Sequence, residues 1–567
     1  MRASKAIPRR LRRPAPPGGD GQARDEADRG RDAYRRRAWA EAHRCLAAAD
    51  RRAPLAAADL ELLAWAAALI GHDDEFLSLM DRLYQLHLDA GDARRAARSA
   101  FWLGLRLLAM REVGRAGGWL GRAQRLAERT DCVEQGYLFL PVVLRSLGAG
   151  DFDAARAAAS QAVAIGDRFG EADLSAFGRC LLGCALLRQG DVGTGLALID
   201  EAMVAATAGE LTPLLTGFIY CSAISGCNHA YVIDRSREWT AALATWCGSQ
   251  PDLVPFSGRC LVHRAELMQI NGDWHEAIEE ARRASARVAT RADSETAADS
   301  LYQQAEVHRL RGDFAAAERD YRGASELGRD AQPGLALLRL AQGRDQTAVS
   351  AIRRVLTATQ GRLQRARLLP ACVEIELATG DIQGARRAAE ELEQIAADFR
   401  TAVLGAMAAH ARGAVELADG HPEAALEPLQ RAFRVWHEVG APYIAARLRV
   451  LLARAYRALG DRDSATLEVD LAGEVFQRLG AAPDLVALRA LDGRAGAGSR
   501  AGSPDGLSAR ELQVLRLVAS GKTNRVIARE LFLSDKTIDR HVSNIFTKTK
   551  VASRAAATAY AYQHGLV

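Results

Sequence analysis

The side chains best suited to chemistry lie near the C-terminus, on one face of a helix predicted to begin at Ser534. Projected at about 100° per residue, the apolar side of this helix centres on Ile538. The opposite side carries two cations and two hydroxyls, and Asp539 lies on its flank; the four residues are Lys536, Arg540, Ser543 and Thr547. Such groups reach phosphates or base edges in a DNA major groove, whereas an ordinary solvated helix face is the alternative interpretation.

Three further helices are predicted around this face, within residues 507–567. Their start and stop signals are, in chain order, the capping-box pair Ser508 and Glu511, then Gly521, Thr523, Ser534, Ser553 and His564. The second and third helices are joined by a tight turn at Leu533 and Ser534. Two short helices of this kind, followed by a supporting helix, form a helix-turn-helix arrangement.

The charge of the chain supports a polyanionic partner for this region. Residues 507–567 contain ten Lys and Arg against four Asp and Glu, a net charge of +6. Residues 1–13 contain six cations and no acid, so with a total of +5 the rest of the chain carries −7. A basic module on an acidic body favours binding of a nucleic acid by that module.

The stretch from Leu507 to Leu566 resembles the LuxR-type DNA-binding domain. The matching residues are Arg510, Glu511, Val514, Leu515, Gly521, Asn524, Ile527, Ala528, Leu533, Ser534, Lys536, Thr537, Ile538, His541, Val542, Asn544, Ile545, Ser553 and Arg554. The resemblance implies a four-helix domain that binds double-stranded DNA as a dimer, with its third helix in the major groove and its fourth helix pairing the subunits.

On this resemblance the DNA-binding residues are expected at Asn524, Ser534, Lys536, Thr537, Asp539, Arg540, Ser543 and Asn544. Lys536 and Thr537 would hold phosphates, while Asp539, Arg540 and Ser543 would face bases. Two residues depart from the family. Asp539 stands where many members have lysine, which should alter sequence preference, because an acid accepts from cytosine N4. Thr549 stands in the apolar stripe where leucine is usual, which should weaken packing against the fourth helix.

Upstream, a glycine followed five residues later by a small residue recurs at intervals of about forty residues. The glycines are Gly150, Gly190, Gly272, Gly312, Gly343, Gly380, Gly420 and Gly460; the small residues are Ala155, Gly195, Ala277, Ala317, Ala348, Ala385, Ala425 and Ala465. Glycine in the left-handed conformation ends one helix, an Asp that usually follows caps the next, and the small residue lets the two helices approach. Each unit is therefore a helix hairpin, and such hairpins stack into a superhelix.

These repeats resemble tetratricopeptide-like repeats, so we expect an all-α protein: an α-solenoid followed by a four-helix LuxR-type helix-turn-helix domain. The expected segments are a basic, Pro- and Arg-rich disordered segment at 1–30, the repeat array at 31–490, a flexible linker at 491–506 and the DNA-binding domain at 507–567. This order is similar to that of the large ATP-binding LuxR regulators, which usually begin with a nucleotide-binding domain. Here the tripeptide at 521–523 mimics the end of a phosphate loop, but Arg516 stands where its first glycine should be, so ATP binding is not expected.

Several other classes of protein are not supported. The nine cysteines form no CxxC pair, which indicates buried free thiols in a reducing cytoplasm rather than a disulfide framework or zinc site. Leu211 to Ile233 lacks Asp, Glu, Lys and Arg, but its proline, glycines and polar residues favour a buried helix pair over a membrane span. No nucleophile with a base, metal-ligand cluster or phosphate loop is visible, so we expect no enzyme, metal or cofactor.

The sequence therefore predicts a cytoplasmic, sequence-specific transcription regulator, with activation favoured by the family resemblance. The solenoid would receive a protein or small-molecule effector, the DNA-binding domain would form a homodimer through its last helix, and contact with RNA polymerase would follow. The alternative is a repeat-protein adaptor whose basic tail contacts nucleic acid incidentally.

Overall fold

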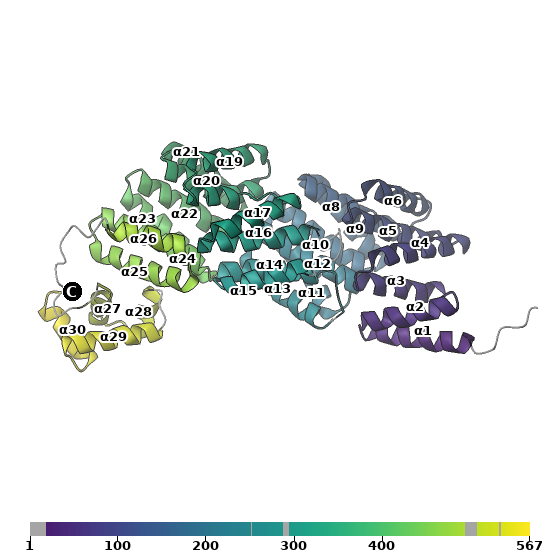
Figure 1. Cartoon of the computed structure of the whole chain (residues 1–567), viewed down its shortest axis with the longest axis horizontal. Coiled ribbons are helices and arrows are strands. Elements are labelled where there is room, and N and C mark those ends of the chain that lie inside the picture. The colour runs from purple at the N-terminus through teal and green to yellow at the C-terminus, as the bar shows by residue number, and fades with distance from the viewer. Residues whose placement is uncertain (1–18, 251, 287–293, 494–506, 508, 532–534) are drawn as a thin grey trace, which may run out of the picture. The chain divides into compact units, whose positions relative to one another are not determined.

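The computed structural model describes residues 19–250, 252–286, 294–493, 507, 509–531 and 535–567, and its regular elements in these ranges are all helices. This confirms the predicted all-α class. Two compact units are formed, and each consists of consecutive antiparallel helices joined by short turns (Figure 1). Within the described residues, unit 1 comprises those between 19 and 228, 235 and 263, and 283 and 297, and unit 2 comprises those between 229 and 234, 264 and 282, and from 298 onward.

The helices of the first half of the chain are α1 (Gly19–Arg35), α2 (Trp39–Arg52), α3 (Ala57–Leu69), α4 (Asp73–Asp89), α5 (Ala93–Ala109), α6 (Val113–Ala127), α7 (Glu134–Tyr137), α8 (Phe139–Ala149), α9 (Phe152–Phe169), α10 (Ala172–Gln189), α11 (Val192–Ala208), α12 (Pro213–His229), α13 (Ile233–Gly248), α14 (Ser257–Asn271) and α15 (Trp274–Ala286). Those of the second half are α16 (Ser294–Arg311), α17 (Phe314–Glu326), α18 (Gly334–Ala341), α19 (Asp345–Ala358), α20 (Arg362–Thr379), α21 (Ile382–Phe399), α22 (Ala402–Ala418), α23 (Pro422–Glu438), α24 (Pro442–Ala458), α25 (Arg462–Leu479) and α26 (Ala482–Gly493). Four more form the C-terminal domain: α27 (Ala509–Ala519), α28 (Asn524–Glu530), α29 (Asp535–Thr549) and α30 (Arg554–Gln563).

The turns of the repeats have the predicted chemistry. All eight glycines of the ladder have φ between +71° and +95°, the left-handed region in which a side chain would be strained. The Asp after five of them accepts a hydrogen bond from the backbone N–H three residues later; these are Asp151, Asp191, Asp313, Asp381 and Asp461. The small residues that follow are all buried. The glycine, cap and small residue therefore act together to fold each hairpin.

The structure also supplies the steps that the glycine ladder lacks. Tyr231, midway between Gly190 and Gly272, has φ +60° and joins α12 to α13. Arg111 (φ +62°) and Gly71 (φ +80°) continue the same spacing toward the N-terminus. The repeat is therefore more regular than glycine alone indicates, because non-glycine residues hold the left-handed turn at two of its steps.

The N-terminal boundary differs from the prediction. Helix α1 begins at Gly19, so residues 19–30 are helical where a disordered segment was expected, and residues 1–18 lie outside the described residues. Ala23, Ala27 and Ala33 are buried on this helix. The helix was not predicted because its buried apolar side chains are only these alanines, among many charged residues. The predicted linker lies mostly outside the described residues, since α26 ends at Gly493 and the description resumes at residue 507.

The remaining predictions on the body of the chain concern thiols and membranes. All nine cysteines are free thiols, and six of them are buried. Over the described residues, no helix combines the length and the apolar character needed to cross a bilayer. The uncharged stretch from Leu211 to Ile233 forms α12 and the turn after it, and buries residues such as Leu215 and Ile219.

Candidate nucleic-acid interface and effector cavity

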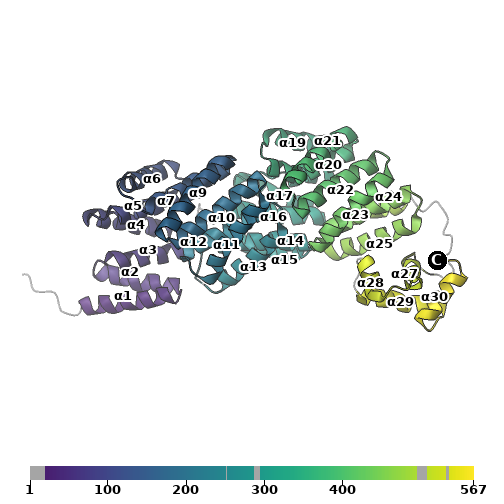
Figure 2. The same cartoon turned by 180° about the vertical axis from the view of Figure 1, so that it is seen from behind.

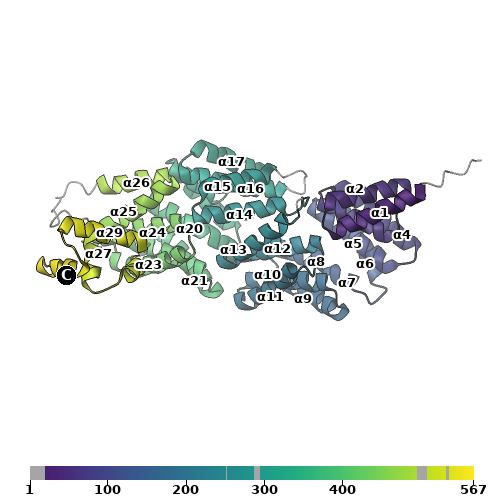
Figure 3. The same ribbon diagram turned by 90° about the horizontal axis from the view of Figure 1, so that it is seen from below.

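The C-terminal domain is a bundle of α27–α30 around a core of its own (Figures 2 and 3). Helix boundaries follow the predicted signals: Gly521 has φ +83° after α27, Thr523 accepts from the N–H of Val526 at 3.4 Å, and Ser553 accepts from the N–H of Ala556 at 3.1 Å. Ser508 lies outside the described residues. The fully buried core includes Val514, Leu515, Ile527, Ile538, Ile545 and Ala557. Each helix thus directs one apolar face inward, and the orientation of α29 is fixed.

Helix α29 presents the predicted polar face to solvent. Ile538, Val542 and Ile545 are buried, whereas the polar residues on the other side are exposed: Asp539, Arg540, Ser543, Asn544 and Thr547. Ser534 lies outside the described residues. Lys536 and Thr537 belong to the first turn of α29, but their side chains are not among those described. The residues expected to face bases therefore share one exposed surface.

Asn524 holds three helices together at the edge of this surface. Its amide nitrogen donates to Asp539 Oδ1 of α29 at 2.7 Å, and its amide oxygen accepts from Arg554 Nη1 of α30 at 2.6 Å. Arg554 also donates to the carbonyl of Lys522 just before α28. Asn524 and Asp539 were both predicted to bind DNA. In the structure, this network sets the position of the Asp539 carboxylate on the exposed face.

Arginines that the sequence analysis did not single out extend the cationic surface. Arg525 and Arg529 lie one turn apart on α28, and both are exposed, as are Arg540 and Lys550. None of the four has an ion-pair partner among the described side chains, whereas Lys522 pairs with Glu530 at 2.5 Å. The i, i+4 spacing of two arginines in the helix before the turn was the signal that could have found them.

Two polar contacts lie near the C-terminal end of α29, one to α27 and one within the helix itself. Lys548 Nζ of α29 lies 2.6 Å from Oε2 of Glu511, a residue of α27 whose side chain is buried. Thr549, the departure from the apolar stripe, is 8 % exposed and donates its hydroxyl to the carbonyl of Ile545 at 2.7 Å. Its polar group is therefore satisfied by its own helix, so the substitution leaves no unpaired donor in the core.

Unit 2 contains a second candidate site, a cavity of about 320 Å³. It is lined by the first helices of consecutive hairpins, α16, α18, α20, α22 and α24, and by α25 and α26. The array closes around it, because Trp274 and Leu310 share one apolar core with Ala446, Phe476 and Leu488. Residues separated by well over a hundred positions thus line one space.

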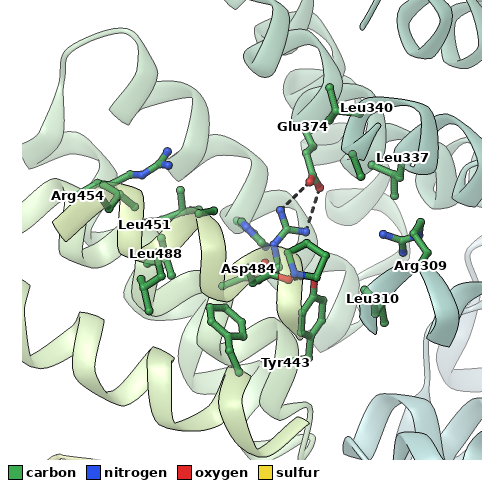
Figure 4. Close-up of a pocket in the computed structure, with 18 residues that line it drawn as sticks. Arg309, Leu310, Leu337, Leu340, Glu374, Tyr443, Leu451, Arg454, Asp484 and Leu488 are labelled. Atoms are coloured by element: carbon green, nitrogen blue, oxygen red, sulfur yellow. Dashed lines mark hydrogen bonds and ion pairs between the residues drawn. The ribbon is translucent and has the colours of Figure 1, made fainter. Parts of the chain in front are cut away.

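The cavity wall combines leucines with a cluster of charged groups (Figure 4). Arg447 forms a bidentate pair with Glu374, at 2.8 Å and 3.0 Å, and Tyr443 donates to Asp484 at 3.1 Å. Burial and the charge of Arg447 lower the pKa of His410 to about 4, so this imidazole is neutral at pH 7. Burial raises the pKa of Asp484.

Two arginines of the wall keep hydrogen-bonding capacity. Arg309 pairs with Glu306 at 2.7 Å, but its buried Nε–H has no hydrogen-bond partner among the described atoms. No ion pair is recorded for Arg454 within the described residues, and burial together with the charge of Arg447 lowers its pKa. In Figure 4 these two guanidinium groups lie on opposite sides of Glu374 and Asp484. Cations therefore remain available at both ends of an otherwise compensated cluster.

Comparison with known proteins identifies the C-terminal domain. Residues 505–561 match the family described as bacterial regulatory proteins, luxR family. Among curated proteins, the transcriptional regulatory protein LiaR of Bacillus subtilis (strain 168) is 35 % identical over 116 residues, which are 20 % of this chain and 47 % of LiaR. The response regulator protein VraR of Staphylococcus aureus (strain NCTC 8325 / PS 47) is 43 % identical over 61 residues, 11 % of this chain and 29 % of VraR. The chain spans less than half the length of these relatives.

Two solved structures align with most of the chain at low similarity. The APC/C hetero-tetramer Cut9-Hcn1 aligns over 82 % of this chain and 90 % of its own, with a TM-score of 0.42 and 13 % identity. Yeast Tom70 aligns over 83 % and 96 %, with a TM-score of 0.31 and 13 % identity. The family match, the four-helix core and the exposed face of α29 agree on one assignment: residues 505–561 form a domain of the luxR family of bacterial regulatory proteins.

Proposed function

We propose that this protein is a sequence-specific DNA-binding transcription regulator whose repeat array receives a signal. The observation that carries the proposal is the exposed polar face of α29, with Arg540 and Ser543, within a domain of the luxR family. A helix braced on its apolar side and exposed on its cationic side fits a major groove.

The contacts divide by chemistry. Arg540 and Ser543 read base edges, and Arg525 and Arg529 on α28 neutralise phosphates beside the groove, as Lys536 and Thr537 do at the start of α29. Asn544 borders the same face. Asp539 has one carboxylate oxygen bound to the Asn524 amide, and its other oxygen accepts from a cytosine amino group.

DNA binding involves a homodimer formed through α30. Three exposed residues, Ala555, Ala559 and Tyr562, follow one another at i, i+4 and i+7 along this helix, and Tyr562 is 61 % exposed. Two small residues permit close approach of a second copy of the helix, and the aromatic ring adds apolar area. A dimer of this kind presents two copies of α29 to a site with two-fold symmetry.

The cavity in unit 2 supports the signal-receiving role. Its volume lies at the lower end of the range of small-molecule sites, and it combines apolar walls with a few polar groups, as such sites do. The unpaired Nε–H of Arg309 and the guanidinium of Arg454 favour an effector with an acidic group. Binding there would strengthen or weaken the packing of α15 and α16 against α24, α25 and α26. A protein effector that binds the array is the competing form of this signal.

We further propose that the regulator acts in the cytoplasm and activates transcription through RNA polymerase.

Genome-wide mapping of sites bound by the full chain, followed by footprinting on the recovered sequences, tests the proposal. A regulator protects one recurrent motif at promoters, and the neighbouring genes indicate the class of signal. Binding without sequence preference would instead favour the adaptor whose basic tail contacts DNA incidentally. Turnover of ATP by the purified chain would contradict our expectation that it is not an enzyme.

A further inference from the structure

Two histidines and a glutamate converge in unit 1, far from the DNA-binding domain in sequence. His43 lies on α2, His72 directly precedes α4, and Glu75 lies in the first turn of α4. Their candidate ligand atoms all lie within 4.8 Å of one another. His43 is 14 % exposed, whereas Glu75 and His72 are 39 % and 52 % exposed, so the cluster opens to solvent on one side.

His72 departs from the chemistry of the repeat. The residue after the turn glycine is usually an Asp that caps the next helix, as Asp151 does after Gly150. After Gly71 the residue is His72, and its side chain makes no capping hydrogen bond. The imidazole instead turns toward Glu75 and His43, with its Nδ1 3.3 Å from Glu75 Oε2. No oxygen of the residue at this position therefore caps the N-terminus of α4.

The ligand atoms lie close to the spacing that a small metal ion requires. His43 Nε2 and His72 Nδ1 lie 2.8 Å and 3.3 Å from the same carboxylate oxygen, Glu75 Oε2. The rings meet edge to face, with centroids 5.0 Å apart. Tetrahedral Zn²⁺ with bonds of about 2.0 to 2.2 Å places neighbouring ligand atoms about 3.3 to 3.6 Å apart. Small rotations of these side chains reach that spacing.

We propose that His43, His72 and Glu75 form a binding site for a divalent transition-metal ion, with Zn²⁺ as its best probe. Two imidazoles and one carboxylate are a donor set that suits Zn²⁺, and not Mg²⁺ or Ca²⁺, which prefer oxygen ligands alone. The open side leaves the fourth position to water. The ion would replace the hydrogen bonds that both rings now form with the carboxylate, and would join α2 to the start of α4.

The sequence predicted no metal site, because the three ligands follow no familiar spacing. His43 on α2 and Glu75 on α4 are 32 residues apart, and only the packing of α2, α3 and α4 brings them together. An ordinary hydrogen-bonded pair between His43 and Glu75 is the competing explanation. That pair requires only one histidine, whereas the metal site requires both, so variants of His72 distinguish the two.

Calorimetric titration of Zn²⁺ into the full chain, free of any tag and treated with chelator, tests the site. We expect about one Zn²⁺ per chain and a rise in the unfolding temperature of unit 1. In His72→Ser, the serine supplies a cap oxygen but no imidazole, so the fold persists. Loss of a residue that only hydrogen-bonds to a metal ligand typically weakens metal affinity by about 10-fold or more. His72 is a direct ligand, so we expect His72→Ser to bind Zn²⁺ at least about 10-fold more weakly. His43→Ala should give the same loss.

His421→Ser is the matched control. His421 also follows a turn glycine, and its Nδ1 lies 3.4 Å from Glu416 and 3.8 Å from Asp419. Its two carboxylate neighbours already pair with Arg386, at 3.2 Å and 2.6 Å, and no second imidazole joins them, so this variant should keep the affinity of the parent. Co²⁺ in place of Zn²⁺ should show no thiolate charge-transfer band, and Cys45→Ser, two residues from His43, should leave its spectrum unchanged. Absence of binding, equal binding by the parent and His72→Ser, or a thiolate band would overturn the proposal.

Discussion

Replacement of Arg540 by alanine is the sharpest test of how this protein recognises DNA. Arg540 is exposed in the middle of α29 and has no ion-pair partner among the described side chains, so its removal breaks no ion pair there. The core residues behind it, Ile538 and Val542, are untouched. Any change in affinity therefore reports the contact with DNA and not the stability of the bundle.

The expected size of the loss follows from the chemistry of an arginine at a base edge. A bidentate contact to guanine is worth about 1 to 3 kcal/mol of discrimination, which corresponds to a roughly 5- to 150-fold weaker binding of the cognate site. The affinity of Arg540→Ala for random duplex should change little, because the lost contact is to a base edge and the phosphate contacts remain. Lys536→Ala, by contrast, should weaken cognate and random DNA alike and reduce the salt slope by about one.

The assay is fluorescence anisotropy of the full chain with cognate and random duplexes at several fixed salt concentrations. Arg478→Ala removes the same charge from an exposed position on α25, outside the DNA-binding domain, and should leave both affinities unchanged. Equal losses on cognate and random DNA for Arg540→Ala and Lys536→Ala would refute the division into base-reading and phosphate-binding residues.

Three further substitutions test other parts of the structure. Asn524→Ala removes hydrogen bonds to two charged groups at 2.7 Å and 2.6 Å, so we expect a loss of about 1 to 3 kcal/mol and faster hydrogen exchange in α28–α30; unchanged exchange would contradict the network. In Gly183→Ala the new Cβ would lie 2.6 Å from the carbonyl oxygen of Gly195, so thermal unfolding should show a loss of about 1 to 3 kcal/mol, whereas Gly193→Ala meets no atom within 4 Å and should not destabilise. Burial holds the pKa of His410 at about 4, below its usual 6.5, so the unfolded chain binds a proton that the folded chain excludes. Stability should fall by up to about 3 kcal/mol as the pH drops from 6.5 to 4, and denaturant titrations of His410→Gln should lack this dependence.

The repeat architecture could be predicted where chemistry is local. The left-handed turn, the cap and the small residue lie within six positions of each other. Gly312, Asp313 and Ala317 therefore predict a hairpin without reference to any other part of the sequence. Tyr231 performs the same turn with an ordinary side chain, and its φ of +60° is fixed by the helices on either side of it. Tertiary packing overrides local preference there, and a search for glycine passes over the step.

The DNA-binding face was predictable for a related reason, since helical periodicity alone separates Ile538 from Arg540. The cavity in unit 2 was not predictable. Its wall is assembled from side chains between Arg309 and Leu491 on seven helices, and their meeting depends on the closure of the array. Hydrophobic periodicity and glycine spacing do not predict that closure, because the sequence pattern of a hairpin is the same in an open and in a closed superhelix.

The Asn524 network changes how the departure at Asp539 should be understood. A carboxylate on a DNA-facing helix would ordinarily repel phosphates and turn freely in solvent. Here the amide nitrogen of Asn524 donates to one oxygen of Asp539, and the amide oxygen of Asn524 accepts from Arg554. The arginine cation is therefore linked to the carboxylate through one intervening side chain. The arrangement reduces the field of the carboxylate and restricts its rotamer, which lowers the entropy lost on binding. An acid placed in this way acts as a fixed hydrogen-bond acceptor, and selectivity for cytosine at that position should depend as much on Asn524 and Arg554 as on Asp539 itself.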